Sequence, residues 1–170
     1  QGPIRYWDIP TSPEHSDQDE GAWLERLDEA VSAAVQRQLV SDVPLGAFLS
    51  GGVDSSLVVA AMGPAKTFSI GFDDPTYNEL AYSEQVARHL GTDHDTRLIQ
   101  PDVADLFDGL MHHMDDPIGD FSIFPTYLVS SLARESVTVS LSGDGGDELF
   151  GGYETYLAQR MAERYARVPG

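Results

Sequence analysis

Apolar and polar residues alternate with two different periods along the chain. Over residues 22–40, apolar side chains recur every three or four positions, which is typical of an amphipathic helix with one face on a core. Over residues 67–72, apolar and polar positions alternate one by one, as they do in a strand. The same patterns predict further strands at 43–49, 96–99 and 137–141, further helices at 53–62, 78–90, 101–114 and 124–134, and a last, mostly helical stretch at 148–167.

Residues that begin and end helices support these boundaries. Asn78 is suited to cap the helix at 78–90, and Gly91 is suited to end it. Strands that alternate with helices predict an α/β fold, in which an open parallel sheet has helices on both faces and right-handed crossovers. Residues 1–20 are rich in proline and acidic side chains, and we expect them to be a solvated linker.

Composition and charge narrow the range of functions. A length of 170 residues, of which 41% are hydrophobic, suits one globular domain. The absence of cysteine excludes a disulfide framework, a thiolate zinc site and a cysteine nucleophile within this chain. The net charge of -18, with Lys66 as the only lysine, argues against nucleic acid or an anionic membrane as a partner. No apolar run is long enough to span a membrane and no leader-like segment opens the chain, so we expect a cytoplasmic protein.

A glycine-rich turn follows the strand predicted at 43–49. This first turn, residues 50–56, reads Ser50-Gly51-Gly52-Val53-Asp54-Ser55-Ser56. Its two glycines let the backbone approach a ligand, and its three serine hydroxyls and the free N–H groups of the next helix can bind an anion. Such a cradle can hold phosphate without a basic side chain, which a chain of this charge requires.

A second turn, residues 142–148, follows the strand predicted at 137–141 and reads Ser142-Gly143-Asp144-Gly145-Gly146-Asp147-Glu148. If the two strands are neighbours, both turns lie at the carboxyl ends of the strands, where open α/β sheets bind ligands. Asp54 would repel phosphates unless a cation lay between them, so we expect Mg²⁺ at Asp54 with Asp147 as its second ligand. Asp144 is a further candidate, for the metal or for substrate.

Each turn alone has a simpler interpretation. The first could be a plain strand-to-helix loop and the second an acidic surface loop. Two such turns, each after an apolar strand and each with carboxylates, favour a ligand site. Three familiar sites are absent. Lys66 lies outside the glycine-rich turns, so there is no Walker-type phosphate loop, and neither turn reads Gly-x-Gly-x-x-Gly, the dinucleotide-binding fingerprint. Phe48 stands where the nucleophile elbow of hydrolases needs glycine.

The segment SGGVDSS at 50–56 resembles the PP-loop signature of ATP pyrophosphatases, which cleave ATP between its α and β phosphates. Three further segments resemble the synthetase domain of glutamine-hydrolysing asparagine synthetases: VPLG at 43–46, TFSIGFDDPTYNELAYSEQVARHLGTDH at 67–94 and SGDGGDELFGGY at 142–153. The resemblance covers about residues 5–157 and implies an adenine-nucleotide alpha-hydrolase-like fold.

The resemblance implies the synthesis of asparagine from aspartate and ATP through β-aspartyl-AMP, with release of pyrophosphate. Ammonia would come from glutamine in a separate glutaminase domain, ATP and Mg²⁺ would be the ligands, and a homodimer stays open. The residues that the resemblance assigns to ATP are Phe48, Leu49 and Ile70 around adenosine, Ser50, Gly51, Gly52, Asp54, Ser55 and Ser56 around the pyrophosphate portion, and Ser142 and Gly143 beside the nucleotide. It assigns Asp54 and Asp147 to Mg²⁺, Asp144 to the reacting centre, and Asp120 and Ser122 to the surroundings of the substrate.

Some features of that family are missing from these residues. They contain no catalytic cysteine of a glutaminase domain, and they stop before the basic residues that the family places downstream of the second turn. We therefore expect 1–20 to be a linker after an absent N-terminal glutaminase domain and 21–170 to be the nucleotide-binding part of the synthetase domain, with weak or no activity alone. Two alternatives stay open: a ligase that adenylates another carboxylate, such as a β-lactam synthetase, and a non-catalytic binding or assembly domain.

Overall fold

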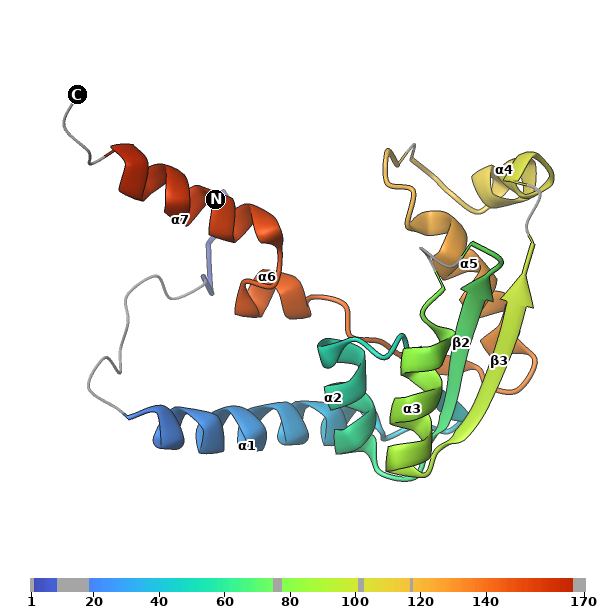
Figure 1. The fold of residues 1–170 in the computed structure, drawn as a ribbon, viewed down its shortest axis with the longest axis horizontal. Helices are drawn as coiled ribbons and strands as arrows, with labels where there is room; N and C mark the ends of the chain where they lie inside the picture. Colours follow the sequence, from blue (N-terminus) through green and yellow to red (C-terminus); the bar gives the residue numbers. More distant parts are fainter. Residues whose placement is uncertain (1, 9–18, 75–77, 101–102, 117, 167–170) are drawn as a thin grey trace.

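The computed structural model describes residues 2–8, 19–74, 78–100, 103–116 and 118–166 (Figure 1). Helices and strands follow one another in the predicted order. The helices are α1 (Glu20–Gln38), α2 (Val53–Met62), α3 (Leu80–Leu90), α4 (Val103–His112), α5 (Ile123–Arg134), α6 (Gly146–Phe150) and α7 (Glu154–Ala166). The strands are β1 (Leu45–Phe48), β2 (Lys66–Phe72), β3 (Asp93–Ile99) and β4 (Val139–Leu141).

The four strands form one parallel sheet in the order β3-β2-β1-β4. Phe48 of β1 pairs with Phe68 of β2, and Ala47 of β1 pairs with Leu141 of β4 on the other side. The chain therefore runs from β1 outward through β2 to β3, and then returns to add β4 on the opposite side of β1. This reversal makes the junction between β1 and β4 the switch point of the sheet.

Helices cover both faces of the sheet, as predicted. On one face α1, α2 and α3 pack on β1 through Val35, Val59, Ala87, Ala47 and Leu49. On the other face α5 packs through Leu132 and Ala133 around Phe68 and Val137. Crossovers of one handedness explain this division, because connections that run along the sheet in opposite directions must pass over opposite faces.

Strand β2 departs from the prediction in its burial. The alternation at 67–72 predicts one buried face, but Thr67 and Ser69 on the other face are buried as well. The reason is that β2 lies inside the sheet, with α3 packed on one side and α5 on the other. Strand β3 also begins earlier than predicted, at Asp93, because it pairs with the whole length of β2.

Helix boundaries agree closely for α2 and at the end of α3. Gly91 ends α3 in the left-handed conformation, and the Asn78 side chain accepts a hydrogen bond from the Leu80 N–H at 3.1 Å. The mostly helical stretch predicted at 148–167 is confirmed, with a break at Gly151 that separates α6 from α7. Across this break the Tyr153 hydroxyl donates to the Glu148 carboxylate at 2.7 Å.

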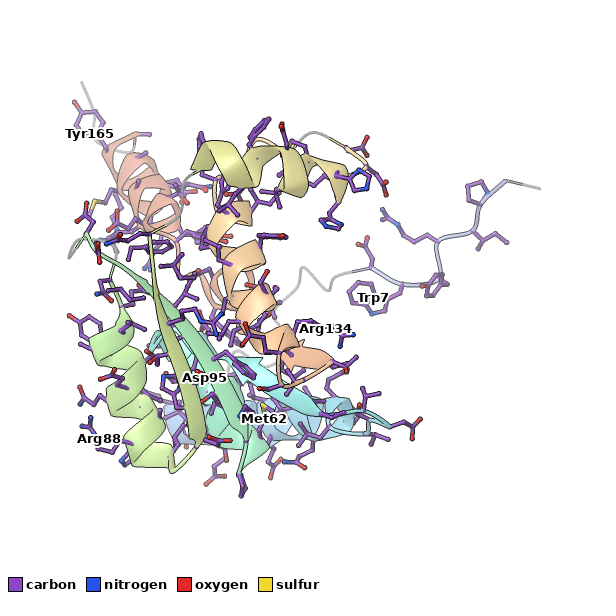
Figure 2. The ribbon with its side chains drawn as sticks, turned by 90° about the vertical axis from the view of Figure 1, so that its right-hand side faces the viewer. Trp7, Met62, Arg88, Asp95, Arg134 and Tyr165 are labelled. Carbon is purple, nitrogen blue, oxygen red and sulfur yellow. The ribbon has the colours of Figure 1, made fainter. Side chains whose placement is uncertain are left out.

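Two helices extend away from the sheet (Figure 1). The Asp19 carboxylate caps α1 by accepting from the Ala22 N–H at 2.8 Å, but only the second half of α1 packs on the core, and Leu24 is 58% exposed. Helix α7 buries no residue, and Figure 2 shows Tyr165 at its far end, pointing away from the sheet. The predicted core-facing stripe of residues 22–40 is thus confirmed for its second half only.

Part of the predicted linker at 1–20 lies outside the described residues. Its described residues, 2–8 and 19–20, are exposed, and the linker prediction is wrong at its end because Asp19 caps α1 and Glu20 begins it. Pro101, the first residue of the helix predicted at 101–114, also lies outside them. In the described part of the chain, no helix combines the length and the apolar character that crossing a membrane requires.

Candidate functional site

The two glycine-rich turns meet at the switch point of the sheet. The first turn leaves β1 and the second leaves β4, and these strands are paired neighbours. A Cβ atom added to Gly143 would lie 2.6 Å from the Ser55 nitrogen and 2.9 Å from the Asp54 carbonyl carbon. The second turn therefore rests against the start of α2, and the juxtaposition expected from sequence is present.

Hydroxyl groups organise the first turn from within. The Ser50 and Ser55 hydroxyl oxygens lie 2.9 Å apart, the Ser50 N–H donates to Ser55 Oγ at 3.3 Å, and the Gly52 N–H donates to Ser50 Oγ at 3.2 Å. Gly51 adopts a φ of 84°, and a Cβ there would lie 2.6 Å from the Ser83 nitrogen of α3. The turn is therefore preorganised, and only glycine fits at position 51.

Helix α2 begins in the first turn without a side-chain cap. Gly52 is its N-cap residue, and the first intrahelical hydrogen bond runs from the Ser56 N–H to the Gly52 carbonyl at 3.0 Å. The N–H groups of the first helical turn and the positive end of the helix dipole are therefore directed toward this turn. This is the arrangement in which helix N-termini bind phosphate groups.

Ser56 differs from the other two serines of the first turn. Its hydroxyl oxygen is buried and has no hydrogen-bond partner among the described residues. The residue lines a groove of about 660 Å³ between α2 and α3, together with Tyr82 and Gln85. Its role at the pyrophosphate stays a prediction.

The expected metal ligands Asp54 and Asp147 come from the two facing turns, and both are half-buried. The Asp54 carboxylate lies against the backbone of Gly146, where a Cβ would be 2.7 Å from Oδ1 and 2.8 Å from Oδ2. The Asp147 carboxylate lies against Gly152, whose N–H donates to the Asp147 carbonyl at 3.0 Å.

This pair of carboxylates suits Mg²⁺ bound together with a nucleotide. Mg²⁺ takes one or two carboxylates and completes its octahedron with phosphate oxygens and water. The described residues contain no group of three or more acidic or histidine side chains arranged for a metal, so an all-protein cage is not formed by them. The donor set at Asp54 and Asp147 fits the nucleotide-assisted mode.

Asp144 is exposed at the tip of the second turn. The Ser142 hydroxyl donates to its Oδ2 at 2.9 Å and accepts from its backbone N–H at 3.4 Å. These contacts restrain the direction of the Asp144 carboxylate, and its place at the reacting centre stays a prediction.

A cavity of about 210 Å³ opens beside the first turn, at the carboxyl ends of β1 and β2. The three residues expected around adenosine, Phe48, Leu49 and Ile70, all line it, and so does Ser50. The rest of its wall was not predicted from the sequence and consists of Phe68, Ser69 and Phe72 from β2, Glu79 and Ser83 near and in α3, and Pro125, Thr126 and Val129 from α5. The sequence alone does not reveal which turn of α5 faces the cavity. Ser69 could have been singled out, because it is a polar residue between the apolar Phe68 and Ile70.

Asp120 and Ser122 lie apart from the two turns, before α5. The Ser122 N–H donates to Asp120 Oδ1 at 2.9 Å, and hydrogen bonds from the backbone and side chain of Ser122 lower the pKa of the Asp120 carboxyl. Asp120 lines a second, mostly apolar cavity of about 830 Å³ between α4 and α5. The two cavities adjoin, since Phe72 and Pro125 line both. The pair thus stabilises the start of α5, and its contact with substrate stays a prediction.

An open parallel sheet with an anion cradle at its switch point and an apolar cavity beside it is typical of nucleotide-binding α/β proteins. Residues 26–170 match the profile of a protein family described as asparagine synthase. The chain belongs to this family.

Individual relatives support the assignment. The chain is 43% identical to "Putative asparagine synthetase (glutamine-hydrolyzing) 2" of Methanocaldococcus jannaschii, over 96% of this chain and 33% of the relative. It is 36% identical to "Asparagine synthetase (glutamine-hydrolyzing) 1" of Bacillus subtilis, over 89% of this chain and 25% of the relative. The chain therefore spans a quarter to a third of the length of these relatives.

The chain is also similar, at lower identity, to proteins with other names. The chain is 26% identical to "Amidase chyE" of Penicillium rubens, over 93% of this chain and 27% of that protein. Among solved structures it resembles the NH3-dependent NAD synthetase of Campylobacter jejuni, with a TM-score of 0.48 and 15% identity over 76% of this chain and 60% of that chain. A likeness at that level says nothing about the reaction.

Proposed function

We propose that this chain is the nucleotide-binding part of an ATP-dependent asparagine synthetase. In this proposal aspartate and ATP form β-aspartyl-AMP and pyrophosphate, and ammonia then displaces AMP to give asparagine. The observation that carries the proposal is the packing of the second turn against the start of α2, which puts an uncapped helix N-terminus and two carboxylates at one switch point. Membership of the asparagine synthase family supports the choice of reaction.

ATP would lie across the junction of the cavity and the first turn. The cavity wall formed by Phe48, Leu49 and Ile70 would hold adenosine, and Ser142 and Gly143 would flank the nucleotide. The N–H groups at the start of α2 and the hydroxyls of Ser50 and Ser55 would donate to the phosphates. Binding through backbone dipoles lets a chain with a net charge of -18 hold a polyanion.

Asp54 and Asp147 would hold Mg²⁺ against the phosphates. Bound there, Mg²⁺ would neutralise the charge that develops on the leaving pyrophosphate. The part played by the chain is to keep both carboxylates on one side of the phosphates, and the contact of Asp54 with the Gly146 backbone limits where its carboxylate can lie.

The chemical step requires positioning rather than proton transfer. The β-carboxylate of aspartate is ionised at neutral pH, so it can attack the α-phosphorus directly, and the bond from the α-phosphorus to the bridging oxygen breaks as pyrophosphate leaves. Asp144, directed by Ser142, would attract the ammonium group of aspartate or the incoming ammonia. The attack of ammonia on the β-carbonyl then releases AMP and a proton.

The wider organisation of the protein belongs to the same proposal. Ammonia would come from glutamine in a glutaminase domain that precedes residues 1–20 in the parent protein, with those residues as the linker. The parent protein would work in the cytoplasm, and a homodimer is compatible with the scheme.

Aspartate-dependent exchange of radioactive pyrophosphate into ATP by the full-length protein tests the proposal. We expect exchange with wild type, about a hundredfold slower exchange with Asp54→Asn because charge at the phosphates is no longer neutralised, and normal exchange with Asp28→Asn. Asp28 is the matched control, since it is an exposed aspartate on α1.

Other outcomes would point to the alternatives. Exchange with another carboxylic acid but not with aspartate would favour a related ligase of the β-lactam synthetase type. No exchange together with no binding of Mg-ATP in calorimetry would favour a non-catalytic binding or assembly domain.

A further inference from the structure

Two serine hydroxyls hold the peptide group between Leu49 and Ser50 from opposite sides. The hydroxyl of Ser69 on β2 donates to the Leu49 carbonyl oxygen. The N–H of the same peptide group, which belongs to Ser50, donates to Ser55 Oγ at 3.3 Å.

This peptide group lies where the chain leaves the sheet. The Leu49 N–H still donates to the Phe68 carbonyl of β2 at 2.9 Å, whereas Ser50 already belongs to the first turn. Leu49 is 1% exposed and Ser69 is 5% exposed, so water has little access to the carbonyl group. A buried carbonyl needs a partner, and Ser69 supplies it through a side chain at the point where the strand ends.

The same peptide group joins the two parts of the proposed ATP site. Leu49, Ser50 and Ser69 line the cavity, and Ser50 Oγ accepts the Gly52 N–H within the first turn. A rotation of this peptide would therefore move the Ser50 hydroxyl and disturb the hydrogen bonds that shape the turn.

We propose that Ser69 is a positioning residue for nucleotide binding, which acts by fixing the Leu49–Ser50 peptide group at the junction of the cavity and the first turn. The inference rests on the proposed function, because it takes the first turn as the site of the phosphates. It assigns Ser69 an effect on phosphate binding although its side chain lies in the wall of the cavity beside the turn.

A second buried hydroxyl on β2 provides a matched control. Thr67, two residues before Ser69, is fully buried, and its Oγ1 lies 2.9 Å from Thr92 Oγ1 and 2.9 Å from His94 Nδ1 near the start of β2. Thr67→Val removes a buried hydroxyl from the same strand without touching the first turn. It should lower the melting temperature and leave nucleotide affinity unchanged.

The test is calorimetric titration of the full-length protein with Mg-ATP and, separately, with inorganic pyrophosphate in the presence of Mg²⁺. We expect Ser69→Ala to weaken both ligands about five- to tenfold, the effect of losing one hydrogen bond, and Ser69→Thr to bind nearly as wild type because it keeps the donor. If Ser69 instead contacted adenosine directly, Ser69→Ala would lower the affinity for ATP and leave the affinity for pyrophosphate unchanged.

Unchanged pyrophosphate affinity in folded Ser69→Ala would overturn the inference, and so would an equal loss in Ser69→Ala and Ser69→Thr. If Ser69→Ala does not fold, Ser69→Cys takes its place, since a thiol has a similar size and is a weaker donor. Wild-type affinity for pyrophosphate in Ser69→Cys would also overturn the inference. Failure of the wild-type protein to bind either ligand would contradict the proposed function itself, whereas equal binding by wild type and Ser69→Ala contradicts only the role of Ser69.

Discussion

Because residue 146 is a glycine, the Asp54 carboxylate can lie close to its backbone. Both Asp54 oxygens lie within 3 Å of the position that a Cβ would take, at 2.7 and 2.8 Å. Gly146 begins α6 and has no positive φ, so the need for glycine there comes from contact and not from backbone conformation. One residue of the second turn thereby sets the position of a proposed metal ligand in the first.

This contact leads to a prediction at the residue scale. Gly146→Ala should displace the Asp54 carboxylate and weaken Mg-ATP binding about tenfold, equivalent to about 1.4 kcal/mol, as measured by calorimetry. Gly109→Ala is the control, because a Cβ at this position in α4 would meet no atom within 4 Å. Normal affinity in Gly146→Ala would show that the contact with Gly146 does not position Asp54.

At the scale of elements, β3 is an edge strand whose pairing with β2 includes a half-buried histidine. His94 on β3 accepts from or donates to Thr67 Oγ1 through Nδ1, and its Nε2 is buried without a partner among the described residues. Burial lowers the pKa of His94 below its ordinary value of 6.5, although the nearby Glu84 and Asp95 carboxylates act in the opposite direction. The folded state therefore favours a neutral imidazole at this position.

The sign of the resulting pH dependence follows from linkage. With the pKa of His94 lower in the folded state, the unfolded chain binds more protons near pH 6.5, so the free energy of unfolding falls as the pH drops through this region. We expect urea denaturation to show lower stability at about pH 5.5 than at about pH 7.5, and a smaller difference in His94→Gln. His89→Gln, at an exposed histidine of α3, is the control. An equal pH dependence in wild type and His94→Gln would rule out His94 as its source.

At the scale of the whole molecule, negative charges outnumber the positive charges that could pair with them. The sequence has 28 acidic residues against 10 basic ones, and the ion pair between Arg97 and Glu135, at 2.8 Å, is exposed. Exposed pairs of this kind contribute little to stability. The folded chain therefore carries self-repulsion that unfolding would relieve.

Screening of this repulsion should stabilise the protein. We expect the melting temperature to rise by a few degrees as KCl is added, with most of the rise complete by about 0.3 M, where the Debye length has fallen to about 6 Å. A parallel series with sucrose, which leaves charges unscreened, separates screening from a general solvent effect. A melting temperature that stays constant from low to molar salt would contradict the repulsion argument.

The sequence alone determined the type and order of the elements, because helix and strand periods and glycine stops are local properties of the chain. It also identified both glycine-rich turns and three residues of the cavity wall, since SGGVDSS and SGDGGDELFGGY are specific enough to imply their family. For the last stretch the sequence predicted mostly helical structure but not the place of the break at Gly151, because a single glycine can either interrupt a helix or lie within one.

Only the tertiary structure decided which segments meet. The order β3-β2-β1-β4 makes the two turns neighbours. It also buries both faces of β2, so that Ser69 lines the cavity, although the alternation of apolar residues predicted burial only for Phe68, Ile70 and Phe72. Pro125, Thr126 and Val129 reach the cavity because α5 crosses the face opposite α2. The physical reason is that a repeating pattern specifies which face of an element is buried, whereas the partner of that face is chosen by crossovers and packing between residues far apart in the chain.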